Sequence, residues 1–336
     1  MSSTSLGGLL RRPEAGAALG LIAVLIFFAF FGGVTFLKPA GMASWLNVAA
    51  NLGVIAIPLG LLMIAGELDI SVGAMVPFGA MTVAVVSGHY DMPIWLGVAM
   101  ALSFGVIVGL VNGILVVKTA VPSLIVTLGS LFAVQGVVLG LTVLITKSTS
   151  VALSVEGPAK AMFGDFLFGG QLQVMALWWL GLTALYIFFV HFSPFGNWIF
   201  AMGGDKVSAR NAGIPTDRLT IILFVLSATS AAFVGMSQAI LYNSAQVAGG
   251  QSFIFNAIIS VVVGGVLLTG GFGSVVGIFF GTITFAIVTQ GIYYTDFDRN
   301  WSSLIIGVLL LGAVLMNNTF RKMALSATTK KKGAKA

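Results

Sequence analysis

The most regular feature of the sequence is a succession of long apolar runs, separated by short polar or glycine-rich stretches. Most runs approach the length of about 20 residues that an α-helix needs to cross the hydrocarbon core of a bilayer. The pattern therefore predicts an all-α integral membrane protein with about ten transmembrane helices. The expected spans are 17–37, 46–65, 70–87, 94–116, 122–146, 174–192, 219–241, 254–269, 273–293 and 301–319.

We expect these spans to form one polytopic transmembrane domain over residues 17–319. Tails of residues 1–16 and 320–336 flank it, and both are expected in the cytoplasm because ten spans return the chain to its starting side. Lysine and arginine concentrate in the cytoplasmic loops of membrane proteins. With the N-terminus inside, twelve of the 16 basic residues fall inside, and four fall outside: Lys38, Lys147, Lys160 and Arg299.

The composition excludes most soluble classes of protein. Charged residues make up 8% of the 336 positions, against about a quarter in soluble domains, and hydrophobic residues make up 58%. The same numbers exclude intrinsic disorder. The chain has no cysteine and two histidines, which excludes thiolate zinc sites and cysteine nucleophiles and argues against a histidine metal site. We therefore expect no catalytic residue, no metal site and no bound cofactor, and we attribute the net charge of +6 to topology and not to nucleic-acid binding.

A short polar stretch, Gly66-Glu-Leu-Asp69, separates two apolar runs, either as a loop between two helices or as a break within one. Charge inside a membrane is expensive and is usually kept for function, so Glu67 and Asp69 are candidates for an ion relay. The alternative, which we favour, is that Asp69 caps a helix starting near Ile70. This break is expected close to the cytoplasmic face, where water solvates the carboxylate.

Uncharged amides are the main polar groups within the spans. Asn51, Asn112 and Gln135 are candidates to line a pathway for a neutral, hydroxyl-rich solute, although such amides more often bond neighbouring helices to one another. An ion pathway would need charge rings or carbonyl filters, and the sequence shows neither pattern.

Glycine recurs every four residues at positions 105, 109 and 113, and again at 273, 277 and 281. Both stripes predict close helix packing, because small residues let helix backbones approach each other in lipid. Residues 69–73 and 273–277 also echo each other, each at the start of a predicted helix. This match is too short to establish an internal repeat.

Two connections are long enough to carry structure of their own, an outer segment at 147–173 and a cytoplasmic loop at 193–218. Other connections are short, so the 26-residue cytoplasmic loop is the expected docking place for a partner. A short helix is expected around residues 206–212, with Gly203-Gly204 and Gly213 supplying turns and caps on either side.

Four segments, in order and with the right gaps, resemble the ribose-type permease subunits of bacterial ABC sugar importers, within the branched-chain amino acid/ribose permease superfamily. They are Gly66-Glu-Leu-Asp-Ile-Ser-Val-Gly73, Gly109–Val116 with Val121–Gly129, Gly196–Asp205 with Ala209–Ile214, and Gly264–Ser274. Departures from the family pattern are Glu67, Leu124, Asn197, Asp205 and Ser208. The resemblance covers roughly residues 60–285.

The resemblance implies that the chain is half of a transmembrane pore in the lipid bilayer of the bacterial inner membrane. A second permease subunit, identical or different, would complete the pore, with ATP-binding subunits inside and a sugar-binding protein outside. It also implies that the loop at 193–218 couples to the ATPase, through Gly203, Gly204, Ala209, Arg210 and Gly213. The chain lacks a Gly-x-x-x-x-Gly-Lys-Ser/Thr phosphate loop, so ATP hydrolysis is expected in a separate subunit and the chain is not expected to be an enzyme.

Two alternatives stay open on the sequence. The first is an ion-coupled secondary transporter, in which Glu67 and Asp69 hold a proton or a sodium ion. The second is an ABC permease for nucleosides or branched-chain amino acids. The first would transport without partners, whereas the second would share every partner of a sugar permease.

Overall fold

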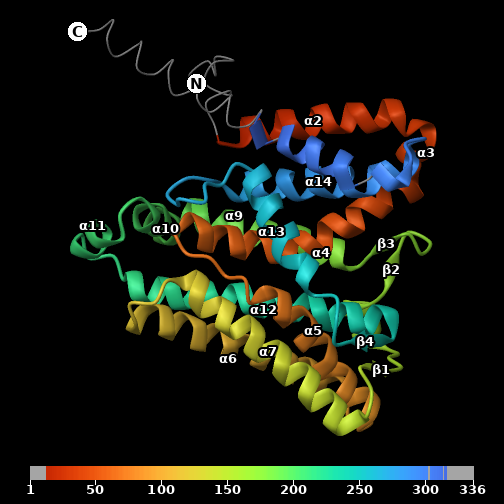
Figure 1. The fold of residues 1–336 in the computed structure, drawn as a ribbon, viewed down its shortest axis with the longest axis horizontal. Coiled ribbons are helices and arrows are strands. Elements are labelled where there is room, and N and C mark those ends of the chain that lie inside the picture. Colours follow the sequence, from red (N-terminus) through yellow and green to blue (C-terminus); the bar gives the residue numbers. More distant parts are fainter. Residues whose placement is uncertain (1–12, 302, 313, 316–336) are drawn as a thin grey trace, which may run out of the picture.

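The computed structural model describes residues 13–301, 303–312 and 314–315, and it is built almost entirely from helices (Figure 1). The long helices are α2 (Pro13–Phe31), α4 (Pro39–Ile64), α6 (Ile94–Lys118), α7 (Ser123–Thr146), α9 (Met175–Phe192), α12 (Thr216–Tyr242) and α14 (Val275–Gly291). The shorter helices are α3 (Gly33–Leu37), α5 (Val72–Val83), α8 (Pro158–Phe163), α10 (Pro194–Gly204), α11 (Lys206–Asn211) and α13 (Gln251–Val263). Helix α5 continues as a π-helix over Ala84–His89.

Two small antiparallel ribbons complete the fold. Strand β1 (Ser150–Ala152) pairs with β4 (Ser244–Gln246), and β2 (Phe166–Leu167) pairs with β3 (Leu172–Gln173). All four strands lie at one end of the helix bundle, which we call the strand end, and α10 and α11 project from the opposite end, which we call the α11 end (Figure 1). The two long connections expected from the sequence therefore do carry structure, at opposite ends of the molecule.

The prediction of an all-α integral membrane protein is confirmed. Eight helices of the described residues are long and apolar enough to cross a membrane. Helix α13 has 13 residues, about 20 Å, which is shorter than the hydrocarbon core of about 30 Å. The apolar helix Ser303–Gly312 is also short. The count of ten spans and the side on which each terminus lies stay predictions, and most of both tails, 1–12 and 316–336, lies outside the described residues.

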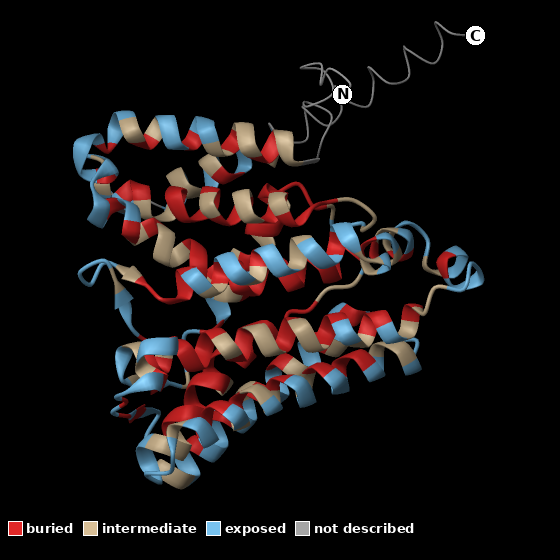
Figure 2. Cartoon of the chain, turned by 180° about the vertical axis from the view of Figure 1, so that it is seen from behind, coloured by how far each residue is buried: buried red, intermediate tan, exposed pale blue. Residues whose placement is uncertain are grey.

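Large apolar side chains are exposed along the helices that form the outside of the bundle, while the middle of the bundle is buried (Figure 2). Phe132 on α7 and Ile107 on α6, for example, are 63% and 51% exposed. A soluble monomer rarely exposes apolar surface on this scale, whereas a membrane protein presents it to lipid tails.

Both glycine stripes form helix contacts, as predicted. A methyl group on Gly105, Gly109 or Gly113 would lie within 2.7 Å of the α12 backbone. In the second stripe, Gly277 and Gly281 pack on the end of α13, where a methyl group on Gly281 would lie 2.1 Å from the carbonyl oxygen of Ser260. Gly273 lies before α14 and faces the side chains of Val266 and Ile64. The α6–α12 and α13–α14 pairs are therefore held at backbone contact.

Candidate functional site

Two helix breaks near the α11 end share one backbone geometry. The first break (Ala65–Ser71) ends α4 with Gly66 at φ +90°, and the amide of Glu67 donates to the carbonyl of Leu62 at 3.1 Å. The second break (Gly264–Ser274) ends α13 with Gly265 at φ +90°, and the amide of Val266 donates to Val261 at 3.2 Å. This is the glycine C-cap in which a left-handed residue lets the chain turn back on the last helical carbonyls. The echo segments themselves, 69–73 and 273–277, lie after these turns, at the starts of α5 and α14, and residues 66–69 belong to a loop between two helices.

Asp69 is completely buried, which corrects the expectation that water solvates it. Its Oδ1 accepts hydrogen bonds from the backbone amide of Ser71 at 2.9 Å and from the Ser71 hydroxyl at 2.5 Å. Helix α5 starts at Val72, two residues later than expected, so these bonds hold the turn that precedes the helix. The expectation was wrong about solvation because α6, α7 and α12 pack around α5 and cover the turn.

Polar side chains from α6 and α7 surround the first break. Asn112 is completely buried, donates to Ser71 Oγ at 3.0 Å, and accepts a short hydrogen bond from the Ser130 hydroxyl. On α7, Ser123 Oγ accepts from the amide of Leu68 at 3.2 Å, and Thr127 Oγ1 accepts from the amide of Ile70 at 3.3 Å. Side chains of α7 thus satisfy two backbone amides of this buried loop, and Asn112 of α6 holds the side chain of Ser71.

The loop between α9 and α12 is helical over most of its length, and the expected short helix is α11. Asp205 caps it: the Asp205 carboxylate accepts from the amides of Val207 at 2.9 Å and Ser208 at 3.1 Å. The hydrogen bond from the Ser208 backbone is the main cause that lowers the pKa of Asp205 below its ordinary value. At the other end, Gly213 has φ +86° and turns the chain into α12.

The residues assigned to coupling differ in exposure. Ala209 is 4% exposed and faces the protein, while Arg210 forms an ion pair with Asp217 at the start of α12. Gly204 has open space around it. The apolar side chain that α11 presents outward is Val207, which is 70% exposed and was missed by the sequence analysis. No pattern in the sequence distinguishes its outward position from the inward position of Ala209.

Gly203 joins this loop to both breaks. A methyl group at Gly203 would lie 1.7 Å from the carbonyl oxygen of Ile64 and 2.5 Å from the amide nitrogen of Gly271. The amide of Gly271 itself donates to the Ile64 carbonyl at 2.8 Å. Next to this contact, the Lys206 ammonium lies 2.5 Å from the Glu67 carboxylate. The junction of α10 and α11 is therefore attached to the first break by the ion pair of Lys206 and to both breaks by backbone contact at Gly203.

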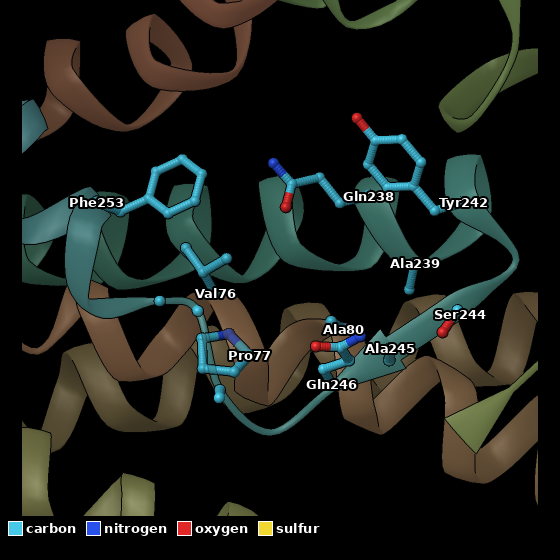
Figure 3. A pocket seen from close by; sticks show the side chains of 13 residues that line it. Val76, Pro77, Ala80, Gln238, Ala239, Tyr242, Ser244, Ala245, Gln246 and Phe253 are labelled. Atoms are coloured by element: carbon cyan, nitrogen blue, oxygen red, sulfur yellow. The ribbon is translucent and has the colours of Figure 1, made fainter. Parts of the chain in front are cut away.

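A cavity of about 290 Å³ opens toward the strand end, between α5, α12 and the chain that leads into α13 (Figure 3). We call it the amide cavity, after Gln238 and Gln246. It is lined by Val76, Pro77, Ala80, Gln238, Ala239, Tyr242, Ser244, Ala245, Gln246, Ala248, Gly249, Gly250 and Phe253. Gln238 and Tyr242 lie one turn apart on α12, and Gln246 comes from β4 (Figure 3).

The three candidate pathway amides have different surroundings. Asn51 Oδ1 accepts from Gln238 Nε2 at 3.4 Å, and its Nδ2 donates to Gln173 Oε1 at 2.7 Å, so Asn51 stands directly behind the amide cavity. Asn112 supports the first break. Gln135 is half-buried on α7 and belongs to neither place. The amide cavity itself was missed, because the non-helical chain that lines it has no distinctive composition.

Comparison with known proteins identifies a family that this sequence matches. The family described as "Branched-chain amino acid transport system / permease component" matches residues 41–314. The inner membrane ABC transporter permease protein YjfF of Escherichia coli (strain K12) is 31% identical over 268 residues, which are 78% of this chain and 78% of that protein. The fructose import permease protein FrcC of Rhizobium meliloti is 27% identical over 93% of this chain and 87% of its own length. The ribose import permease protein RbsC of Escherichia coli (strain K12) is 27% identical over 89% and 92%. No solved structure matches.

Proposed function

Because the chain belongs to the branched-chain amino acid transport system / permease component family, we propose that it forms the translocation pathway of an ATP-binding-cassette importer for a sugar. It is a multi-pass protein of the inner membrane, as its apolar helices and its relatives indicate. The relatives named for ribose and fructose import support a sugar as the solute. The observation that carries the mechanism is the attachment of α10 and α11 to both helix breaks.

In this proposal the α11 end faces the cytoplasm and the strand end faces outward. Described basic residues near the α11 end, such as Lys118, Lys206 and Arg218, fit this orientation. A separate ATP-binding subunit docks on the exposed side of α11, around Val207. A second permease subunit and an outer sugar-binding protein complete the importer. The chain itself hydrolyses no ATP and binds no cofactor in this proposal.

The contacts of the loop give a physical route for coupling. Nucleotide binding that displaces α11 would act on the first break through Lys206 and Glu67, and on the second break through the backbone contact at Gly203. ATP and the loaded sugar-binding protein each favour one packing of the helices, so together they shift the population between outward-facing and inward-facing states.

A charge placed on the outer side of α11 tests the docking surface. We expect Val207→Glu, in the complete importer in liposomes, to abolish ATP hydrolysis stimulated by the binding protein, because Val207 is exposed and its loss leaves the fold intact. Val121→Glu is the matched control at another exposed valine of the α11 end, and it should retain stimulation. Equal stimulation in both variants would remove the docking role of α11.

The rival secondary transporter predicts a different result with the chain alone. Purified without partners in liposomes, the protein should take up no sugar under a proton or sodium gradient. Gradient-driven uptake by the isolated chain would replace the importer proposal, and the buried Asp69 would then be the first residue to test as the ion site.

A further inference from the structure

We propose that the amide cavity is a binding site for a single sugar ring on the translocation path, with Gln238 and Gln246 as its hydrogen-bonding side chains. The inference rests on the proposed importer function and adds to it the place where the solute touches this chain. Three features of the cavity carry it: unwound backbone, oriented amides and a neutral lining.

The first feature is non-helical backbone beside a membrane-spanning helix. After α12 ends at Tyr242, the chain runs along α5 to Gly250, where a methyl group would lie 1.9 Å from the carbonyl oxygen of Gly73. Irregular backbone at membrane depth persists where it is buried in protein or lines a water-filled cavity. Within the part of the chain that the structure describes, the amides of Ala248 and Gly249 donate no hydrogen bond, and both residues line the cavity. They are available to solute hydroxyls.

The second feature is a pair of amides that face the cavity from different elements. Asn51 holds the Nε2 group of Gln238, which leaves the Gln238 carbonyl oxygen to accept from a ligand. Gln246 is exposed on β4 and lines the cavity. Amides both donate and accept, as sugar hydroxyls do, so two of them can fix the orientation of a ring.

The third feature is the chemistry and size of the lining. Among its residues there is no Asp, Glu, Lys, Arg or His, so a cation or a zwitterionic amino acid would lose its hydration without gaining a countercharge. Phe253 and Tyr242 add aromatic surface, which can cover the apolar face of a ring. A volume of about 290 Å³ lies just below the range usual for small-molecule sites, about 300–1,000 Å³. A single sugar ring matches both properties.

Sugar uptake by the complete importer in liposomes tests the site. Ribose, xylose and fructose serve as separate labelled probes, and the sugar that the wild type imports is then used with Gln238→Ala and Gln246→Ala. We expect each variant to lower uptake about fivefold, the effect of one net hydrogen bond, while ATP hydrolysis stimulated by the binding protein persists. Gln171→Ala is the matched control, because this exposed glutamine of the strand end lies outside the cavity.

A thiol-labelling experiment detects binding without transport, so it also tests the site where a variant folds poorly and transports little. The chain has no cysteine, so Gln246→Cys would carry its only thiol. An excess of the imported sugar should slow modification of that thiol by a membrane-impermeant thiosulfonate, and an equal excess of leucine should not. Gln171→Cys should react at the same rate with and without sugar.

The outcomes separate the two proposals. Uptake by both cavity variants at the level of Gln171→Ala, with no protection of Gln246→Cys, would overturn the sugar site and leave the importer function standing. Protection by leucine and not by sugar would also overturn it, in favour of an amino acid. If the wild-type importer takes up none of the three sugars, the proposed function itself is overturned.

Discussion

The first break and the second break have the same backbone turn but different attachments. In the first, Ser123 and Thr127 of α7 satisfy the loop amides, and Asn112 of α6 holds Ser71. In the second, the amide of Leu267 donates to Phe272 at 3.2 Å and that of Gly270 donates to Leu267 at 3.1 Å, so the loop satisfies much of its own backbone. The first break is hydrogen-bonded to α6 and α7, whereas the second forms hydrogen bonds within its own loop and, through Gly271, to the last residue of α4.

This difference indicates how far each of the two breaks would move when α11 is displaced. A loop bonded to α6 and α7 moves with those helices, because each relative shift would leave buried polar groups unpaired. A loop closed on itself can shift as a unit and keep its own bonds. We therefore expect the second break, with α13, to move relative to the first when the importer changes state.

The largest expected effect comes from Gly203, which touches both breaks. Gly203→Ala places a methyl group 1.7 Å from the Ile64 carbonyl, and the backbone on each side must shift to admit it. We expect a loss of about 3 kcal/mol in stability, the upper end for an overpacked core, together with loss of stimulated ATP hydrolysis. Thermal unfolding in detergent measures the first effect.

Gly204→Ala is the matched control, because a methyl group at the neighbouring glycine meets open space. It should unfold at the wild-type temperature or slightly above. If the two variants are equally stable, the close approach of Gly203 to Ile64 and Gly271 does not hold in the protein.

A smaller effect should separate the two breaks. Asn112→Leu leaves the hydroxyls of Ser71 and Ser130 without their amide partner, at a cost of about 1–2 kcal/mol. Hydrogen exchange followed by mass spectrometry should show faster exchange at residues 65–71 and unchanged exchange at 264–274. Gln135→Leu, an amide removed from the next helix, should alter neither segment. Faster exchange of both breaks in Asn112→Leu would show that they are a single mechanical unit.

The smallest effect on stability is expected from the ion pair between Lys206 and Glu67. The side chains are 35% and 13% exposed, so removal of one charge by Glu67→Gln should cost less than about 1 kcal/mol. Stimulated ATP hydrolysis in the complete importer should fall more than stability, because the pair is the direct side-chain link between α11 and the first break. The double exchange Glu67→Lys with Lys206→Glu restores the opposite charges. If stimulated ATP hydrolysis stays low in this double variant, the ion pair has no role in coupling.

The membrane fold could be predicted from the sequence because a helix that crosses the lipid bilayer requires a long run of apolar residues. The eight helices that are long enough to cross a membrane follow those runs, and most glycines of the two stripes lie where helices touch. Helix α11 was also predictable, since Asp205 and Gly213 are residues that start and stop helices. The predicted span 254–269 was wrong over residues 264–269. Helix α13 ends at Val263, because Gly264 and Gly265 turn the chain there.

The roles of individual polar residues could not be predicted in the same way. Asn51 and Asn112 are the same amide in similar apolar runs, but one lies behind the amide cavity and the other supports a buried turn. The difference depends on which helices meet, and that is a tertiary property. Asp69 shows the same limit, since only the packing of α6, α7 and α12 around α5 removes it from water.

The length of helix α12 limits which insertions and deletions this protein can accept over evolutionary time. It is uninterrupted from Thr216, beside Arg210, to Tyr242 in the amide cavity. Each residue added to an α-helix rotates everything beyond it by about 100°. With the contacts of Gly105, Gly109 and Gly113 to Ile221, Val225 and Thr229 held in place, a single insertion between Thr229 and Gln238 would keep the helix but turn Gln238 away from the cavity. The length of this helix is therefore expected to be invariant among working descendants, whereas the exposed turn at Gly169-Gly170, between β2 and β3, can gain or lose residues freely.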